Sequence, residues 1–321
     1  MKALLVGTSN GIIAGGYPAA IRADHRLTEV RNMSVGASPA LFAAYRLHGV
    51  DLSAYQAAFL ETAVNDAACA RADSFSVPTM RKALAATVDI LQSAGVEPLG
   101  LVLPGRTMDR YTAEVVAGQR EVFASAAVWF LDGPRLLDGL ARLLGCNIEA
   151  FFRDSAHLKT DIARVIVAAF LGSFTQYRTP AFADPPGGMR YATLPEITPA
   201  GWQAETKQVS NSLISDTFHR IGAEGISLRV PSGMALAGLA CAGNVSSAIL
   251  AVGGERSVLK DFRFEQGASA RVMVSPFKEP LRPRNGLIRI QALPSTPMGQ
   301  AIERTYTVPK DAAESLGVAY I

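Results

Sequence analysis

The sequence has few cysteines, and no cluster of residues in it has the spacing of a metal site. Its three cysteines are Cys69, Cys146 and Cys241, and none of them forms a CxxC pair with another. This spacing excludes a zinc ribbon and argues against a disulfide framework. An odd number of thiols in mostly apolar surroundings is typical of a reducing compartment. We therefore expect a cytoplasmic protein that holds no metal and no cofactor.

Charged residues are also scarce, and neither sign dominates. They make up 18% of the 321 residues, and 31 lysines and arginines face 28 aspartates and glutamates, for a formal net charge of +3. The basic residues are scattered, without a run of like charge. This distribution excludes nucleic acid and an anionic membrane surface as partners. With 49% hydrophobic residues the chain is expected to be globular, and its length suggests two domains.

The sequence lacks a long run of strongly apolar residues. The N-terminal run of residues 2–7 breaks at once into polar residues, which predicts a buried strand rather than a signal peptide. Residues 231–254 carry no charge, but they are mostly alanine, glycine and serine, which insert poorly into a membrane. No membrane span is expected there. The pattern predicts two strands, 234–241 and 245–252, joined by a hairpin turn at Gly243-Asn244.

The first half of the chain alternates between predicted strands and helices. Short apolar stretches are followed by stretches of helical period, two of which are expected to end at Gly95 and Gly145. Short buried strands separated by helices are typical of a parallel α/β sheet. The predicted strands are residues 2–7, 27–34, 56–62, 98–104 and 127–131, and the predicted helices are 78–94, 108–125, 134–144 and 158–174.

The composition changes after Tyr177. Residues 179–188 are rich in proline and glycine and are predicted to form a linker. Beyond them, short period-2 runs separated by turn residues predict an antiparallel, sandwich-like β domain, with strands at 226–230, 248–252, 258–264, 270–275 and 286–293. We therefore expect two domains, residues 1–177 and 178–321.

A serine and a histidine occupy places where sheets of this kind carry their sites. Ser9 follows the first predicted strand, just after the turn-forming Gly7, and Asp154-x-x-His157 precedes the last predicted helix of the first domain. Sites in open α/β sheets lie outside the carboxyl ends of the strands. Serine, histidine and aspartate are the three parts of a hydrolytic triad. Each motif alone also fits a plain strand–helix turn or a solvated histidine.

Two more residues could supply hydrogen-bond donors to the same place. Gly36 follows the second predicted strand and could present a backbone N–H, and Asn65 follows the third and could present its side-chain amide. The oxyanion of acyl transfer needs such donors. A candidate after each of the first three strands, with Asp154 and His157 near the end of the same domain, favours a serine hydrolase.

The order Ser9, Gly36, Asn65 and Asp154 with His157 resembles the four sequence blocks of the SGNH hydrolases, a subgroup of the GDSL esterases and lipases. The resemblance implies a flavodoxin-like three-layer fold for the first domain. It also implies that Ser9 is the nucleophile, that His157 is the general base and then acid, and that Asp154 orients it. The oxyanion hole would consist of the N–H groups of Ser9 and Gly36 and the amide of Asn65.

The chain departs from the usual SGNH pattern at two positions. It reads Gly7-Thr8-Ser9 where the family usually has Gly-Asp-Ser, and Ala63 stands in place of the glycine in Gly-x-Asn-Asp. Neither change removes a functional group.

The resemblance does not determine the substrate, because SGNH enzymes act on lipid, carbohydrate acetyl and other acyl esters. Without a clear lid or secretion signal, and with an appended β domain, the chain fits a small acylated saccharide or sugar precursor better than a lipid. Trp202, Tyr191 and Phe264 are candidates to stack on a sugar, although aromatic residues in a β domain more often belong to its core. An acyltransferase with the same triad and an inactive SGNH-fold carbohydrate-binding protein are the alternatives. The sequence also leaves open whether the protein forms a homo-oligomer.

Overall fold

The computed structural model describes residues 1–173, 192, 194–200, 202–210, 215–243, 249–253, 256–260, 271–292, 304–305 and 319–320. The chain divides into two compact units. The first comprises Met1–Arg71 and Met80–Arg190, and the second comprises Ala72–Thr79 and Tyr191–Ile321. The boundary expected between residues 177 and 178 lies outside the described residues. No helix in the described ranges is long and apolar enough to cross a membrane.

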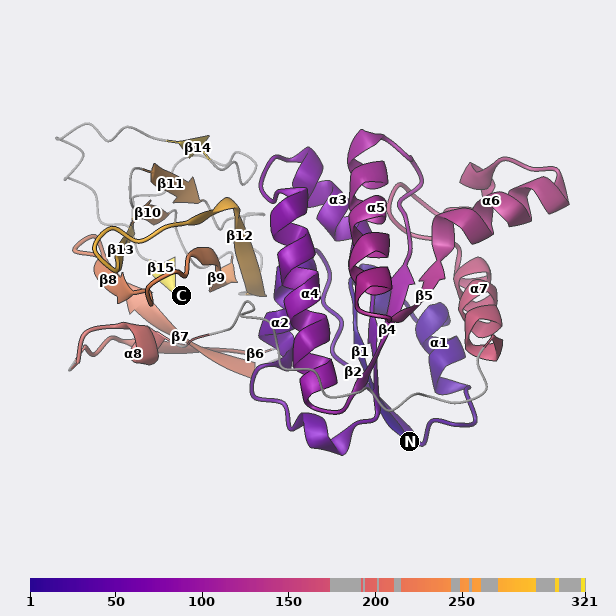
Figure 1. Ribbon diagram of the computed structural model, residues 1–321, viewed down its shortest axis with the longest axis horizontal. Coiled ribbons are helices and arrows are strands. Elements are labelled where there is room, and N and C mark those ends of the chain that lie inside the picture. The colour runs from indigo at the N-terminus through magenta and orange to yellow at the C-terminus, as the bar shows by residue number, and fades with distance from the viewer. Residues whose placement is uncertain are drawn as a thin grey trace. The chain divides into compact units, whose positions relative to one another are not determined.

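The first unit is built on a five-stranded sheet in the order β2-β1-β3-β4-β5, with every neighbouring pair parallel (Figure 1). This is the strand order of flavodoxin-like folds. Because they are covered on both faces, the inner strands β1, β3 and β4 are mainly apolar, whereas the edge strand β2 has the sequence EVRN and is not fully buried. Their bounds are β1 Lys2–Val6, β2 Glu29–Asn32, β3 Ala57–Leu60, β4 Glu97–Val102 and β5 Trp129–Asp132.

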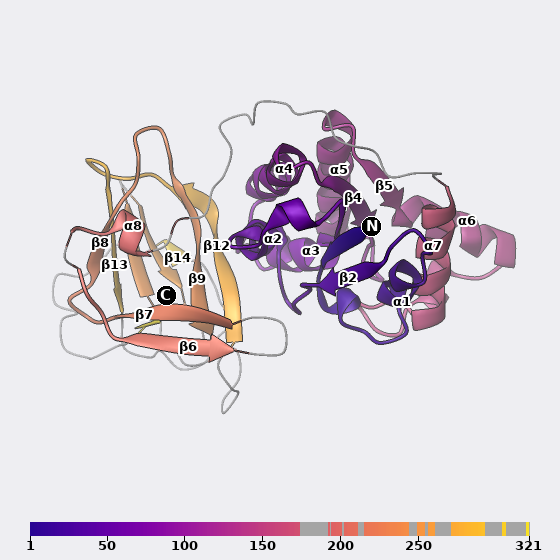
Figure 2. The ribbon, with the colours of Figure 1, turned by 90° about the horizontal axis from the view of Figure 1, so that it is seen from below.

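Helices cover both faces of this sheet and complete three layers (Figures 1 and 2). One face carries α1 (Tyr17–Arg22), α6 (Gly133–Leu144) and α7 (Thr160–Gly172), whose apolar side chains share a core with β1, β3 and β4. The other face carries α2 (Ala40–Leu47), α3 (Ala63–Arg71), α4 (Val77–Ser93) and α5 (Arg110–Ser125). A Cβ on Gly100 of β4 would lie 2.6 Å from the ring of Phe123, so this glycine lets α5 approach the sheet.

The predicted flavodoxin-like fold is therefore confirmed, and each predicted strand of the first unit overlaps an observed one. No helix range was predicted directly after any of the first three strands, where α1, α2 and α3 lie. The helix α1 has only six residues, and α3 has the sequence AVNDAACAR, which lacks the strong apolar stripe that marks an amphipathic helix. Packing against the sheet rather than local periodicity stabilises both.

The second unit is β-rich, and all of its described strand pairs are antiparallel. Its sheets have the orders β14-β11-β10-β13-β8, β12-β9 and β15-β7-β6. Side chains from different sheets, such as Cys241 of β9, Phe277 of β12 and Ile290 of β13, share one buried core. The antiparallel pairing and the core shared between sheets confirm the antiparallel, sandwich-like domain predicted from the sequence.

The described part of the second unit contains one short helix and ten strands. They are α8 Leu194–Ile197, β6 Thr206–Ser210, β7 Ser215–Ile221, β8 Ile226–Arg229, β9 Leu236–Gly243, β10 Ile249–Gly253, β11 Arg256–Lys260, β12 Arg271–Leu281, β13 Leu287–Ala292, β14 Arg304–Thr305 and β15 Ala319–Tyr320.

The predicted hairpin around Gly243-Asn244 is wrong. β9 ends at Gly243 and pairs with β12, whereas β10 begins at Ile249 and pairs with β11 and β13 in another sheet. Both strands are apolar on a buried face, and such a pattern predicts a strand without saying which strand lies beside it.

Candidate active site

Ser9, His157 and Asp154 form one chain of hydrogen bonds at the carboxyl edge of the parallel sheet. Ser9 begins a single turn of 3-10 helix, Ser9–Gly11, three residues after the end of β1. Its Oγ lies 2.7 Å from His157 Nε2, and His157 Nδ1 lies 2.8 and 2.9 Å from the two carboxylate oxygens of Asp154. With Asp154 ionised, Nδ1 donates to the carboxylate, which leaves Nε2 to accept the Ser9 hydroxyl proton.

The loop that carries Asp154 and His157 is closed on itself. Phe152 and Leu158 form an antiparallel bridge, and the Arg153 N–H donates to the His157 carbonyl at 2.8 Å. Inside the loop, Asp154 Oδ1 accepts the backbone N–H groups of Ala156 and His157, each at 2.9 Å. The loop backbone therefore fixes the position of the Asp154 carboxylate independently of its contact with the His157 imidazole.

These hydrogen bonds keep Asp154 charged. Partial burial by itself would raise the pKa of this carboxyl, but the N–H of Ala156 and the side chain and N–H of His157 outweigh it and lower the pKa to about 2. The carboxylate is thus ionised throughout the neutral range, as a partner for an imidazolium must be.

The turn that carries Ser9 packs on a buried carboxylate, Glu61, directly after β3. Three donors converge on its Oε2: the Thr8 N–H at 3.0 Å, the Thr8 hydroxyl at 2.7 Å and the Tyr17 hydroxyl at 3.3 Å. Glu61 and Thr8 are both 0% exposed. Burial raises the pKa of Glu61, while the hydrogen bonds from Thr8 and Tyr17 oppose that shift. The residue before Ser9 is therefore held through both its backbone and its side chain.

Two glycines on either side of Ser9 allow this close packing. A Cβ on Gly7 would lie 2.6 Å from the Tyr17 hydroxyl, and a Cβ on Gly11 would lie 2.2 Å from Ser34 Oγ. Asn32 also donates its side-chain amide to the Gly11 carbonyl at 2.7 Å. The turn thus has no room for larger residues at these two positions.

Gly36 lies beside Ser9, as its place after β2 predicts. A Cβ on Gly36 would lie 3.8 Å from Ser9 Cβ. Within the described part of the chain, the backbone N–H groups of Ser9 and Gly36 donate to no protein acceptor. The side chain of Asn65 donates to the carbonyl of Ser38 at 3.2 Å, so α3 and the Gly36 loop are joined. Two free N–H groups next to the serine hydroxyl could receive an oxyanion.

Asp66, which follows Asn65, connects three elements from inside the first unit. Its Oδ1 accepts the Ala40 N–H at the start of α2 at 2.7 Å, and its Oδ2 accepts the Gln119 amide from α5 at 2.9 Å. Only 1% of Asp66 is exposed. Burial raises its pKa to about 7, although hydrogen bonds from the Ala40 N–H, Thr62 and Gln119 act in the opposite direction.

The raised pKa of Asp66 predicts a pH-dependent stability. Between the ordinary aspartate range and about pH 7, the folded state binds a proton that the unfolded state does not, so its stability falls as the pH rises. Asp66→Asn cannot titrate. The free energy of unfolding of the wild type should therefore fall relative to that of the variant by roughly 1–3 kcal/mol between about pH 5 and pH 7. Urea unfolding at several pH values measures both, and parallel profiles would contradict the prediction.

The structure brings together Ser9, Gly36, Asp154 and His157 from three separate segments of the sequence. It also adds Thr8, Glu61 and Asp66, which sequence reasoning missed as parts of the site. The available signal was Glu61 itself, because an acidic residue at the end of a buried strand needs a partner. Among the described residues, no three His, Cys, Asp or Glu side chains could together hold a metal ion.

Of the three aromatic residues named as candidates for sugar stacking, Trp202 alone lies among the described residues. Tyr191 and Phe264 lie outside the described residues. Trp202 packs against the ring of His219 in the second unit, with ring centroids 5.4 Å apart, and is partly buried against its core.

Known proteins resemble this chain in structure rather than in sequence. No protein-family model and no curated protein matches it significantly. A two-domain esterase active on acetylated mannans aligns over 100% of this chain and 90% of its own, with a TM-score of 0.55 and 11% identity. An acetyl xylan esterase covers 54% of this chain and 98% of its own, with a TM-score of 0.45 and 17% identity. An acetylxylan esterase from Geobacillus stearothermophilus covers 53% and 91%, with a TM-score of 0.42 and 12% identity.

The full-length likeness agrees with the features already described for each unit. The parallel sheet has the flavodoxin-like order, Ser9 follows its first strand, and an antiparallel β unit follows in the chain. The first unit of this protein therefore has the fold of the SGNH hydrolases, the GDSL-like esterases, and a β-rich unit is appended to it.

Proposed function

We propose that this protein is a serine esterase that removes an acetyl group from an acylated carbohydrate. The proposal rests above all on the 2.7 Å contact between Ser9 Oγ and His157 Nε2, with Asp154 on the other imidazole nitrogen. The likeness to a two-domain esterase active on acetylated mannans supports the choice of substrate class.

In the proposed mechanism, His157 takes the Ser9 hydroxyl proton as Oγ attacks the ester carbonyl. The N–H groups of Ser9 and Gly36 and the Asn65 amide stabilise the oxyanion that forms. His157 then gives its proton to the leaving sugar oxygen, and the acetyl group stays on Ser9. Water, deprotonated by His157, attacks the acetyl-enzyme. As the bond to the acetyl group breaks, His157 gives this proton to Ser9 Oγ, which releases acetate and restores the Ser9 hydroxyl.

Covalent labelling tests the nucleophile without knowledge of the natural substrate. A fluorophosphonate probe should react with the protein, and peptide mapping by mass spectrometry should find the adduct on Ser9. His157→Ala should slow labelling by at least about 100-fold, because general-base assistance contributes roughly 10²–10⁴-fold. An adduct on any other serine, or equal labelling of the two proteins, would contradict the proposal.

Product analysis then distinguishes hydrolysis from transfer. NMR of an acetylated oligosaccharide incubated with the protein should show free acetate, with or without an unacetylated sugar present as acceptor. Acetyl groups that appear on the added sugar instead of in solution would mean that the protein is an acyltransferase.

A further inference from the structure

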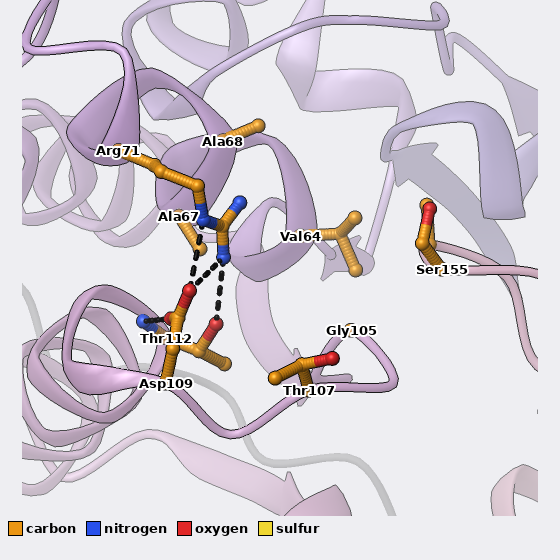
Figure 3. A pocket seen from close by; sticks show the side chains of 10 residues that line it. Val64, Ala67, Ala68, Arg71, Gly105, Thr107, Asp109, Thr112 and Ser155 are labelled. Atoms are coloured by element: carbon orange, nitrogen blue, oxygen red, sulfur yellow. Dashed lines mark hydrogen bonds and ion pairs between the residues drawn. The ribbon is translucent and has the colours of Figure 1, made fainter. Parts of the chain in front are cut away.

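A pocket of about 280 Å³ lies next to the Asp154–His157 loop in the first unit (Figure 3). Its lining includes Val64, which precedes Asn65, and Ala156, which precedes His157, so it begins beside the candidate site. The other parts of its wall come from one face of α3 and from residues 105–112, between β4 and the first turn of α5. The Arg106 N–H donates to the Ser155 carbonyl at 2.9 Å, which ties this second wall to the loop of His157.

The pocket changes in character along its length. Toward Ser155 its walls are small, with Val64 and Gly105 among them, and Ala67 and Ala68 follow on α3 beside Arg71 (Figure 3). Farther along α3, the guanidinium of Arg71 lies against Asp109 and Thr112 (Figure 3). A small-walled space that ends in a charged pair suits a ligand with polar groups at its far end.

The Arg71–Asp109 pair is held in a defined geometry. Arg71 Nε and Nη2 lie 2.8 and 2.6 Å from Asp109 Oδ2, and Nη2 lies 3.4 Å from Thr112 Oγ1. Asp109 Oδ1 accepts the Thr112 N–H at 2.9 Å and caps α5, and this hydrogen bond lowers the pKa of the carboxyl. The third guanidinium nitrogen, Nη1, has no dashed contact in Figure 3 and points away from Asp109.

The small walls and the Arg71–Asp109 ion pair together favour a neutral ligand rich in hydroxyl groups. The pair carries no net charge, so an anionic ligand drawn to Arg71 would also meet the Asp109 carboxylate. A long alkyl chain would remove water from both charges without replacing its hydrogen bonds, which is unfavourable. A hydroxyl group can accept from Arg71 and donate to Asp109. The volume lies just below the usual range of ligand pockets, about 300–1,000 Å³, and suits one sugar ring rather than several.

We propose that this pocket binds one sugar ring on the alcohol side of the ester, and that Arg71 and Asp109 determine this specificity. The assignment to the alcohol side follows from the loop of His157, because this imidazole must lie next to the leaving oxygen that it protonates. The inference rests on the proposed esterase function.

Substrates that differ either in the alcohol part or in the acyl part of the ester test which part the pocket binds. The values of kcat and KM are measured for a monoacetylated methyl glycoside, for p-nitrophenyl acetate and for p-nitrophenyl octanoate. Arg71→Met and Asp109→Asn should each lower kcat/KM for the glycoside by about tenfold or more, mainly through KM, since each removes a hydrogen bond to a charged group. Both should stay within about twofold of wild type on p-nitrophenyl acetate. The asparagine side chain of the Asp109→Asn variant can still cap α5.

Two further variants separate the pocket from general effects. Arg142→Met removes an exposed ion pair with Asp138 on α6, far along the chain from the pocket, and should change none of the three rates. Ala68→Leu fills the pocket from an exposed position of α3. It should lower kcat/KM for the glycoside more than for p-nitrophenyl acetate, whose flat ring takes less room on the same alcohol side than a sugar ring.

The outcomes distinguish this inference from the proposed function. If the wild type hydrolyses p-nitrophenyl acetate through Ser9 but the Arg71, Asp109 and Ala68 variants keep wild-type kcat/KM for the glycoside, only the pocket assignment is overturned. Equal losses on all three esters, or an effect confined to the octanoate, would also overturn it, the latter by assigning the pocket to the acyl chain. Absence of any Ser9-dependent hydrolysis would overturn the proposed function itself.

Discussion

Replacing Ser9 with alanine is expected to lower kcat for p-nitrophenyl acetate hydrolysis by roughly 10³–10⁶-fold. The substitution removes the oxygen that lies 2.7 Å from His157 Nε2 and leaves the imidazole without a nucleophile to activate. The remaining rate would come from donors that still stabilise the oxyanion and from water activated by His157. A spectrophotometric assay of p-nitrophenol release measures the loss directly.

A second serine variant shows whether this loss is specific. Ser53→Ala removes an exposed hydroxyl that hydrogen-bonds to Asp51, outside the candidate site, and should keep wild-type kcat. Thermal unfolding of both variants checks that they fold. Activity of Ser9→Ala within about tenfold of wild type would exclude Ser9 as the nucleophile, because loss of a nucleophile costs far more than this.

Replacing Asp154 with asparagine should lower kcat by about 10²–10⁴-fold while the site keeps its shape. Asp154 Oδ1 is already fixed by the N–H groups of Ala156 and His157 at 2.9 Å. The amide oxygen of asparagine would therefore take that position, and its NH₂ would face His157 Nδ1. A donor there forces Nδ1 to be the acceptor, so the proton moves to Nε2. An Nε2–H cannot accept the Ser9 proton.

Measurement of kcat for Asp154→Asn beside Asp138→Asn tests this argument. Asp138 is an exposed aspartate on α6, paired with Arg142, and its substitution should leave kcat unchanged. If Asp154→Asn retained full activity, the carboxylate would not set the tautomer of His157, and the role inferred for it would be wrong.

Contacts between residues close in the sequence could be predicted, and contacts between distant residues mostly could not. Asp154 and His157 are three positions apart, so their spacing already indicates that they meet. Ser9 and Gly36 could be placed because the parallel strands before them end at the same edge of the sheet. By contrast, Glu61 contacts Thr8 across 53 positions, and nothing in the local sequence reports that contact.

The same limit explains the features of the fold that the sequence did not reveal. The pairing of β9 with β12 connects strands about 30 residues apart, and hydrophobic period alone cannot identify the partner. Arg71 and Asp109 meet across 38 positions, at the ends of helices whose packing depends on the whole sheet. The inner strands of the parallel sheet were predictable because burial on both faces requires apolar runs, which are visible in the sequence itself.

The closed loop around Asp154 and His157 has a consequence for how the site assembles. The histidine–aspartate contact spans three positions and lies within a segment whose ends are bridged, whereas the serine–histidine contact spans 148. Closing the short loop has a small entropic cost, and joining the distant segments requires most of the first unit to fold. An oriented imidazole can therefore exist before Ser9 is in place. During refolding, the return of any Ser9-dependent hydrolysis would then report one late folding step, in which the loop of His157 packs beside the end of β1.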